Sequence, residues 1–227
     1  IHTFLKDLIR AKFLSSEPIG KTDYTGRSNF IQADKLNELW IHTNNSCNLT
    51  CSHCLVNSSP RGDEGLSTDA IKKIINEAVA LGTSRLFFTG GEPFIRQDIF
   101  ELIEYVCNIK NVELILLTNG TLLKGKTLER LQEFDKARLK IQISLDVRGE
   151  GSFSRIVEGI KSIVKIGYLP TVTTVVTNNN IEDIPETTKL IAKLGVKTHH
   201  LLWVHKRGGG SETGLDFFPS FIKELEV

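Results

Sequence analysis

The sequence predicts an α/β protein with the fold of a partial (β/α)6, TIM-like barrel, in which helices cover the outer side of a parallel sheet. Short apolar, β-rich runs alternate with segments of helical periodicity along most of the 227 residues. Most of these runs are apolar on both faces, as are strands buried in a parallel sheet. There are six such runs, enough for a barrel or partial barrel. A doubly wound open sheet is the alternative that periodicity alone leaves open.

The expected elements follow in a regular order. We expect strands over residues 39–44, 85–90, 112–120, 139–146, 170–178 and 198–204. We expect helices between them over residues 66–82, 98–108, 122–133, 153–165 and 185–194. The first of these helices has Ser67 or Thr68 as its N-cap and ends at Gly82. The predicted organisation is a helix and extended arm over 1–37, the barrel over 38–210, and over 211–227 a last helix that would begin a C-terminal extension.

Composition excludes several classes of protein. Hydrophobic residues make up 40% of the chain and charged residues 24%, which is ordinary for a globular domain. The net charge of +1 gives no bulk attraction to nucleic acid or to an anionic membrane. The apolar runs are too short to cross a bilayer, and the first residues do not resemble a secretory signal. We therefore expect a cytoplasmic enzyme with no nucleic-acid or membrane partner.

Three of the four cysteines lie within CNLTCSHC, residues 47–54, while Cys107 lies alone on a predicted helix. A structural zinc site would need a fourth ligand, for which His53 or His42 is available. Three thiolates instead suit a [4Fe–4S] cluster that keeps one iron open for another ligand. The spacing favours an iron–sulfur cluster, and zinc, a redox dithiol and buried cysteines remain alternatives.

In parallel α/β folds the ligand site lies at the carboxyl ends of the strands. The second strand is followed there by Gly90, Gly91, Glu92 and Pro93. These residues predict either a tight turn, or a site where a ligand approaches the backbone while Glu92 accepts a hydrogen bond from an amine. At the last strand His199 and His200 alternate, so that one of the pair is expected to face the barrel mouth.

With these motifs in place, the sequence resembles the radical S-adenosylmethionine (SAM) superfamily. CNLTCSHC fits the pattern C-x3-C-x2-C, GGEP follows one unit later, and the likeness extends over about residues 38–207 through LTNGTLL, ISLD, RGEGSF, EGI and TTVVTNNN. It is closest to enzymes that mature peptides and make cofactors: the molybdenum-cofactor, PQQ, heme-pathway and sulfatase-maturase relatives, many with a SPASM or twitch extension. No second cysteine cluster follows in this sequence, and only Val147 separates Asp146 from Arg148, where relatives have a longer loop.

The resemblance implies roles for particular residues. Cys47, Cys51 and Cys54 would each ligate one iron, and SAM would chelate the fourth through its amine and carboxylate. The residues implied to bind SAM are Gly90, Gly91, Glu92, Pro93, Thr118, Asn119, Ser144, Arg148 and His53. Thr173 and Thr174 would lie near the adenine or the substrate. The resemblance identifies no catalytic side chain.

The implied activity is reductive cleavage of SAM to a 5′-deoxyadenosyl radical, which abstracts hydrogen from a peptide or a small-molecule precursor. The implied partners are SAM, that substrate, and a one-electron reductant such as flavodoxin or ferredoxin. The alternatives are a non-radical iron–sulfur electron-transfer protein and a zinc-stabilised binding module.

Overall fold

A computed structural model describes residues 2–11, 34–146, 151–205 and 207–212. The chain divides into two compact units, residues 1–34 and 35–227. In the first unit, the predicted N-terminal helix is present as α1 (His2–Arg10), with Phe4, Leu5 and Ile9 exposed. The predicted extended arm, Arg148 and most of the predicted last helix lie outside the described residues.

The second unit alternates strands with helices as the periodicity predicts. Its strands are β1 (Glu38–His42), β2 (Arg85–Thr89), β3 (Glu113–Thr118), β4 (Leu139–Ser144), β5 (Thr171–Val176) and β6 (Thr198–Trp203). Its helices are α2 (Thr68–Ala80), α3 (Ile99–Cys107), α4 (Lys126–Gln132), α5 (Phe153–Lys165), α6 (Ile184–Lys193) and α7 (Gly209–Glu212), with short 3₁₀ turns η2 (Pro93–Ile95) and η3 (Ile181–Asp183). Ser67 caps α2 as predicted, because its hydroxyl accepts a hydrogen bond from the amide of Ala70. α4 begins later than expected, after Gly125, whose φ of +50° separates the preceding turn from the helix.

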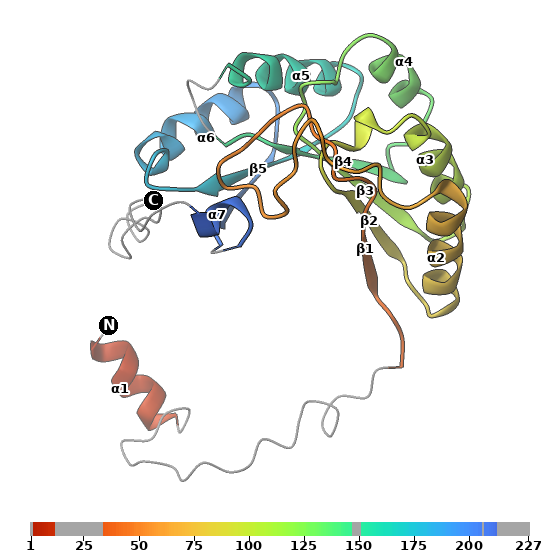
Figure 1. Cartoon of the computed structure of the whole chain (residues 1–227). Helices are drawn as coiled ribbons and strands as arrows, with labels where there is room; N and C mark the ends of the chain where they lie inside the picture. The colour runs from red at the N-terminus through yellow and green to blue at the C-terminus, as the bar shows by residue number, and fades with distance from the viewer. Residues whose placement is uncertain (1, 12–33, 147–150, 206, 213–227) are drawn as a thin grey trace. The chain divides into compact units, whose positions relative to one another are not determined.

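All six strands are parallel and pair in the order in which they occur along the chain, with β1 and β6 at the two edges. A doubly wound sheet would reverse its strand order partway, with helices on both faces. Sequential order with right-handed crossovers instead places every connecting helix on one face. Figure 1 shows α2 to α6 along the outer side of the curved sheet. The partial-barrel prediction is confirmed.

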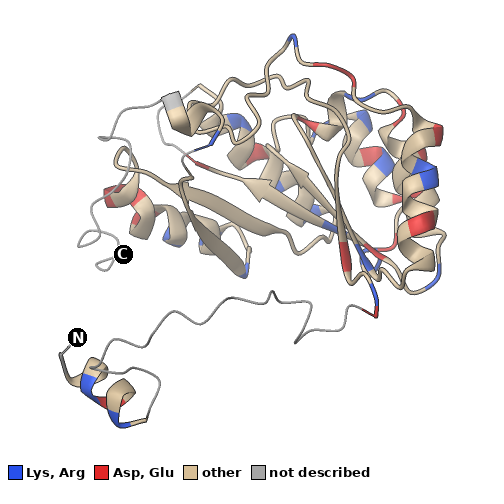
Figure 2. Ribbon diagram, turned by 60° about the horizontal axis from the view of Figure 1, so that its bottom comes forward, with Lys and Arg blue, Asp and Glu red and all other residues tan. Residues whose placement is uncertain are grey.

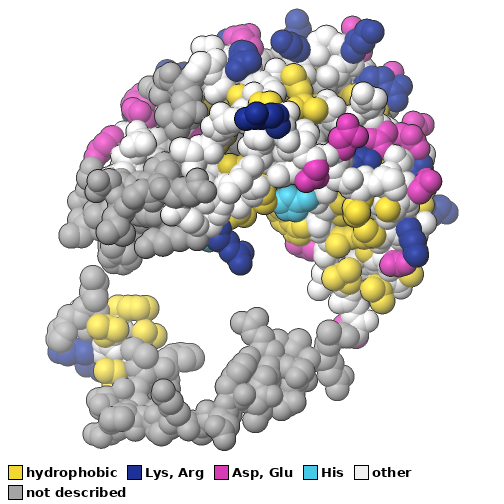
Figure 3. Space-filling model, viewed as in Figure 1, with side chains coloured by type: hydrophobic (Ala, Val, Ile, Leu, Met, Phe, Trp, Pro, Cys, Tyr) yellow, Lys and Arg dark blue, Asp and Glu magenta, His cyan; other side chains and the backbone are white. Residues whose placement is uncertain are grey.

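The core lies between the sheet and its outer helices. Alternate side chains of the inner strands, such as Leu114 and Leu116 of β3, are fully buried there. On the other face of the sheet, Trp40 stacks on Phe87 of the neighbouring strand with ring centroids 4.0 Å apart. Trp40 stays half exposed, and apolar side chains gather over this edge of the sheet (Figure 3).

Basic and acidic residues are mixed along the ribbons of the outer helices (Figure 2). No large field of one sign covers them, as the near-zero net charge leads one to expect. Among the helices in the described ranges, none combines the length and the apolar character that crossing a bilayer requires.

Close packing of α5 against the turn after β3 provides a test of the fold. A Cβ atom added at Gly159 would lie well inside 3.0 Å of the Gly120 carbonyl, a backbone group that cannot rotate away. Alanine is favoured over glycine in a helix by about 1 kcal/mol, but overpacking costs about 1–3 kcal/mol. We expect Gly159→Ala to lower the free energy of unfolding by roughly 1 kcal/mol in urea denaturation.

Gly151→Ala is the matched control, because a Cβ atom there meets none of the described residues within 4 Å. A Gly159→Ala protein as stable as the wild type would show that α5 does not pack on this turn as described.

Candidate functional site

A pocket lies at the carboxyl ends of β2, β3 and β4, where the fold predicts a ligand site. Its empty volume, open mouth included, is about 900 Å³. The predicted site residues that line it are Cys47, Cys51, His53, Cys54, Gly90, Gly91, Thr118, Asn119 and Ser144. The structure therefore brings together most of the residues that the sequence marked, from four separate segments.

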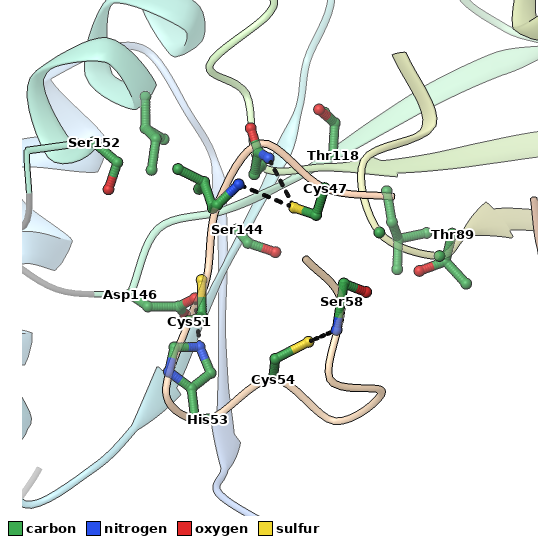
Figure 4. A pocket seen from close by; sticks show the side chains of 16 residues that line it. Cys47, Cys51, His53, Cys54, Ser58, Thr89, Thr118, Ser144, Asp146 and Ser152 are labelled. Atoms are coloured by element: carbon green, nitrogen blue, oxygen red, sulfur yellow. Dashed lines mark hydrogen bonds and ion pairs between the residues drawn. The ribbon is translucent and has the colours of Figure 1, made fainter. Parts of the chain in front are cut away.

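The three cysteines come from one long loop between β1 and α2. Figure 4 shows their sulfur atoms around a common space, with Thr118 and Ser144 approaching from the ends of β3 and β4. The loop closes on itself, because the amides of Asn45 and Ser46 both donate to the Asp63 carbonyl and the amide of Cys47 donates to the Ser59 carbonyl. A compact base thus presents the thiols to the pocket.

Amide groups point at two of the sulfur atoms. Cys47 Sγ accepts hydrogen bonds from the Leu49 amide at 3.4 Å and from Asn119 Nδ2 at 3.8 Å. Cys54 Sγ accepts one from the Ser58 amide at 3.2 Å. Burial raises the pKa of the Cys47 thiol, while the Leu49 amide acts to lower it. N–H donors of this kind stabilise the thiolate form that a metal cluster binds.

Positions 90 and 91 have no room for a side chain, because the cysteine loop lies directly against them. A Cβ atom at Gly90 would collide with the Asn44 carbonyl, and one at Gly91 with the Ser46 carbonyl. Gly90 also has a φ of +137°, which favours glycine. The Gly91 amide donates to the Asn44 carbonyl at 2.9 Å, and the Glu92 amide donates to the Ser46 carbonyl at 2.8 Å. Contact with the cysteine loop alone is enough to explain why both positions are glycine. That the two glycines also let a ligand approach the backbone stays a prediction.

Glu92 is fully buried behind the pocket wall. Its Oε1 accepts hydrogen bonds from the Thr118 hydroxyl at 2.8 Å and the Phe94 amide at 3.2 Å, and its Oε2 accepts one from the Asn119 amide at 2.8 Å. Burial raises the pKa of Glu92 to about 7, against the lowering effect of these donors. The carboxyl group therefore joins the end of β2 to the end of β3. Its contact with a SAM amine remains a prediction, as does that of Pro93, which is buried at the start of η2.

Asn119 joins the turn after β3 to the cysteine loop. In addition to its contact with Cys47, its Nδ2 donates to Asn48 Oδ1 at 2.9 Å. Asn48 Nδ2 in turn donates to the Thr121 hydroxyl at 2.8 Å. This short polar network holds the first cysteine against β3.

His53 contacts the end of β4, an arrangement that the spacing of CNLTCSHC did not predict. Its Nε2 lies 2.9 Å from Asp146 Oδ2, and both side chains are largely buried and line the pocket. The other Asp146 oxygen accepts a hydrogen bond from the Val175 amide at 2.8 Å. Asn180 adds a second tie, because its Nδ2 donates to the carbonyls of Asp146 and Val175. His53 is thus fixed in orientation by β4 and β5.

The sequence also marked Thr173, His199 and His200, which lie on β5 and β6. His199 bridges Thr174 of β5 and Thr188 of α6, with 2.9 Å at each ring nitrogen, so it belongs to the helix-covered face. His200 pairs with Thr173 and shares its face, as the predicted alternation requires. Within the described residues, the buried Thr173 hydroxyl has no hydrogen-bond partner, and Thr173 shares a face with Ser144.

The donor set fits a multi-iron cluster better than a single metal ion. Over the described part of the chain, no three His, Cys, Asp or Glu side chains gather closely enough to hold one ion. A structural zinc site needs four donors around a single ion. In an iron–sulfur cluster each thiolate binds a different iron, which suits three cysteines spread around one pocket.

Fold and site together define a class of protein: a partial α/β barrel with a three-cysteine pocket at the carboxyl ends of its strands. A family model described as the radical SAM superfamily matches residues 41–191. The chain belongs to the radical S-adenosylmethionine superfamily, as its motifs predicted.

Several curated relatives support this assignment. The chain is 33% identical over 178 residues to the AdoMet-dependent heme synthase of Methanosarcina barkeri, covering 74% of this chain and 50% of the relative. It is 31% identical over 192 residues to mycofactocin maturase MftC of Mycolicibacterium smegmatis, covering 80% and 48%. It is 32% identical to the subtilosin biosynthesis protein AlbA of Bacillus subtilis over 176 residues, covering 73% and 39%. The chain thus spans about half the length of the first two of these relatives and less of the third.

Solved structures share the fold at low sequence identity. Streptococcus suis SuiB bound to its precursor peptide SuiA matches with a TM-score of 0.68 and 18% identity, over 90% of this chain and 51% of SuiB. The protein anSMEcpe with bound AdoMet and the Cp18Cys peptide matches with a TM-score of 0.61 and 19% identity, over 74% of this chain and 50% of that one.

The buried carboxyl of Glu92 predicts a pH dependence of stability. In the unfolded chain Glu92 ionises near its ordinary pKa of 4.5, whereas burial raises the folded-state pKa to about 7. Below this interval the group is protonated in both states. As pH rises through it, the unfolded chain loses the proton first, so Glu92 makes the folded protein progressively less stable until about pH 7.

Glu92→Gln cannot titrate and is the reference for this effect. We expect the free energy of unfolding of the wild type, minus that of Glu92→Gln, to fall between pH 4.5 and 7 in urea denaturation of the metal-free protein. A difference that stays constant or rises over this interval would contradict the buried, proton-binding state of Glu92.

Proposed function

We propose that this chain is the catalytic domain of a radical SAM enzyme that holds a [4Fe–4S] cluster and SAM in the pocket described above. One observation carries the proposal: Cys47, Cys51 and Cys54 line one pocket together with the glycine turn after β2 and the polar ends of β3 and β4. When bound, the cluster and SAM supply a 5′-deoxyadenosyl radical that abstracts hydrogen from a substrate. We include a one-electron reductant, such as flavodoxin or ferredoxin, as a partner.

In this proposal the residues of the chain bind the cluster, orient SAM and shield the radical from water. Cys47, Cys51 and Cys54 hold three irons, and the backbone at Gly90 and Gly91 forms the adjoining wall where the SAM amine binds. Ser144 presents a hydroxyl to the same pocket from the end of β4. Leu49, Leu117 and Ile156 contribute apolar surface to the lining, which helps to keep water from a reactive carbon radical.

We propose a peptide or a cofactor precursor as the substrate. Relatives with about 30% identity are named as a heme synthase, a mycofactocin maturase and a subtilosin biosynthesis protein. About half of the first two relatives is not matched by this chain, and a shared fold does not by itself define the substrate. The proposal therefore names the class of substrate and not its identity.

A plain electron-transfer role is the second candidate, and the pocket argues against it. Electron transfer needs a cluster near the surface but no adjacent small-molecule site. Here the cysteines share their cavity with the glycine turn after β2 and the polar ends of β3 and β4. Such an arrangement is typical of a bound cosubstrate.

Substitution of the cysteines tests the cluster site. We expect Cys47→Ala, Cys51→Ala or Cys54→Ala to lose most of the iron and the brown absorbance after anaerobic reconstitution, because each removes one thiolate ligand. Cys107→Ala is the matched control, since Cys107 lies half-buried on α3 and lines no part of this pocket. Equal loss of iron in the control, or none in the three variants, would show that the cluster is held elsewhere.

Reductive cleavage of SAM tests the enzymatic role. We expect reconstituted wild-type protein with dithionite to release 5′-deoxyadenosine, measured by chromatography, and the Cys51→Ala protein to release none above background. Protein that holds an intact cluster and binds SAM but releases no 5′-deoxyadenosine, also in the presence of candidate peptides, would favour the electron-transfer alternative.

A further inference from the structure

Three consecutive glycines, Gly208, Gly209 and Gly210, follow β6 and begin α7. They lie against the cysteine loop, although more than 150 residues separate the two segments in the chain. The Gly209 amide donates a hydrogen bond to the Cys54 carbonyl at 2.8 Å. Figure 1 shows α7 beside the loop that follows β1. We call residues 208–210 the glycine strap.

The strap touches the backbone of the cysteine turn and leaves no room for side chains. A Cβ atom at Gly209 would lie well inside 3.0 Å of the Ser52 carbonyl, and one at Gly208 equally close to the carbonyls of Cys54 and Leu55. These obstacles are backbone atoms, so a rotamer change cannot relieve them. Gly208 has a φ of +55°, whereas Gly209 has no positive φ, so at Gly209 the contact alone requires glycine.

Among the described residues, contacts to Asp146 after β4 and to the segment after β6 both hold the turn that carries Cys51 and Cys54. Toward β4, His53 is tied to Asp146 at 2.9 Å. On the chain segment after β6, the strap binds the Cys54 carbonyl. The base of the loop, between Asn45 and Asp63, is closed separately by its own hydrogen bonds. The strap thus acts on the part of the loop where the second and third thiols are displayed.

We propose that Gly208 and Gly209 are positioning residues for the cluster: they fix the turn over residues 51–54 so that the thiols of Cys51 and Cys54 face the pocket. This inference rests on the proposed function, because it gives the strap a role in holding the same cluster. It also explains a motif that SAM binding leaves unexplained, since the strap lines no part of the pocket. The alternative is that the glycines merely form a surface turn.

Gly209→Ala is the variant that tests the strap. Gly151→Ala is its control, because a Cβ atom at Gly151 meets no atom of the described part of the chain within 4 Å. In the metal-free proteins, we expect amide hydrogen exchange over residues 51–58 to be about tenfold faster in Gly209→Ala than in the control, with the sheet unaffected. We also expect faster alkylation of Cys54. Both measurements are independent of cluster loading.

After reconstitution, we expect Gly209→Ala to retain less iron, to show an altered EPR spectrum of the reduced cluster and to bind SAM more weakly, while the unfolding midpoint stays close to that of the control. If Gly209→Ala does not fold, Gly210→Ala replaces it, because a Cβ atom there collides with the His205 carbonyl and displaces the strap without touching the cysteine turn.

The outcomes separate the two proposals. Wild-type protein that takes up no cluster contradicts the proposed function, whatever the strap does. Wild-type protein that binds the cluster, together with a Gly209→Ala protein whose exchange, iron content and EPR spectrum equal those of the control, overturns the positioning role and leaves a surface turn.

Discussion

The site depends on one buried junction, where the backbone after β2 meets the cysteine loop on one side and the end of β3 on the other. Glycines at positions 90 and 91 let the two backbones approach, and the Glu92 amide donates to the Ser46 carbonyl. The Glu92 side chain then reaches Thr118 and the Asn119 amide. A buried carboxyl group is costly unless it is hydrogen-bonded, so its three donors hold this geometry strongly. The positions of the first cysteine and of the pocket wall both follow from it.

The fold could be predicted from the sequence because each strand of a parallel sheet is recognisable from its own short apolar run. Doubly apolar runs such as 112–120 can be strands only if both faces are covered, and the helical segments between them supply the cover. The limits of the prediction are equally physical. The start of α4 depends on the positive φ of Gly125, and the turn η2 depends on the side chain of Glu92 capping Phe94. Both are settled by local backbone geometry and side-chain capping, which hydrophobic periodicity does not record.

The sequence predicted which residues form the candidate site, but not the hydrogen bonds that connect them. Motifs after each strand identified Cys47, Gly90, Thr118 and Ser144, because the carboxyl ends of parallel strands share one edge. The partners of His53 could not be found in this way, because Asp146 lies 93 residues away. Asn44 was also missed: its buried amide donates to the carbonyls of Ser46 and Glu92, as a link between β1 and the glycine turn. A polar residue at the end of a predicted strand, 39–44 or 139–146, was the one signal available for either.

The sheet leaves β1 and β6 unjoined in the described structure, and this has a consequence for what can reach the pocket. A closed barrel admits ligands through its mouth alone, whereas an unclosed one also offers a lateral approach along its concave side. Strand edges there carry backbone N–H and C=O groups that need partners, and on β6 they are accompanied by exposed Leu201, Leu202 and Trp203. Within the described residues the free side of β6 therefore offers the geometry for pairing with a further extended segment, which supplies complementary groups at the same spacing.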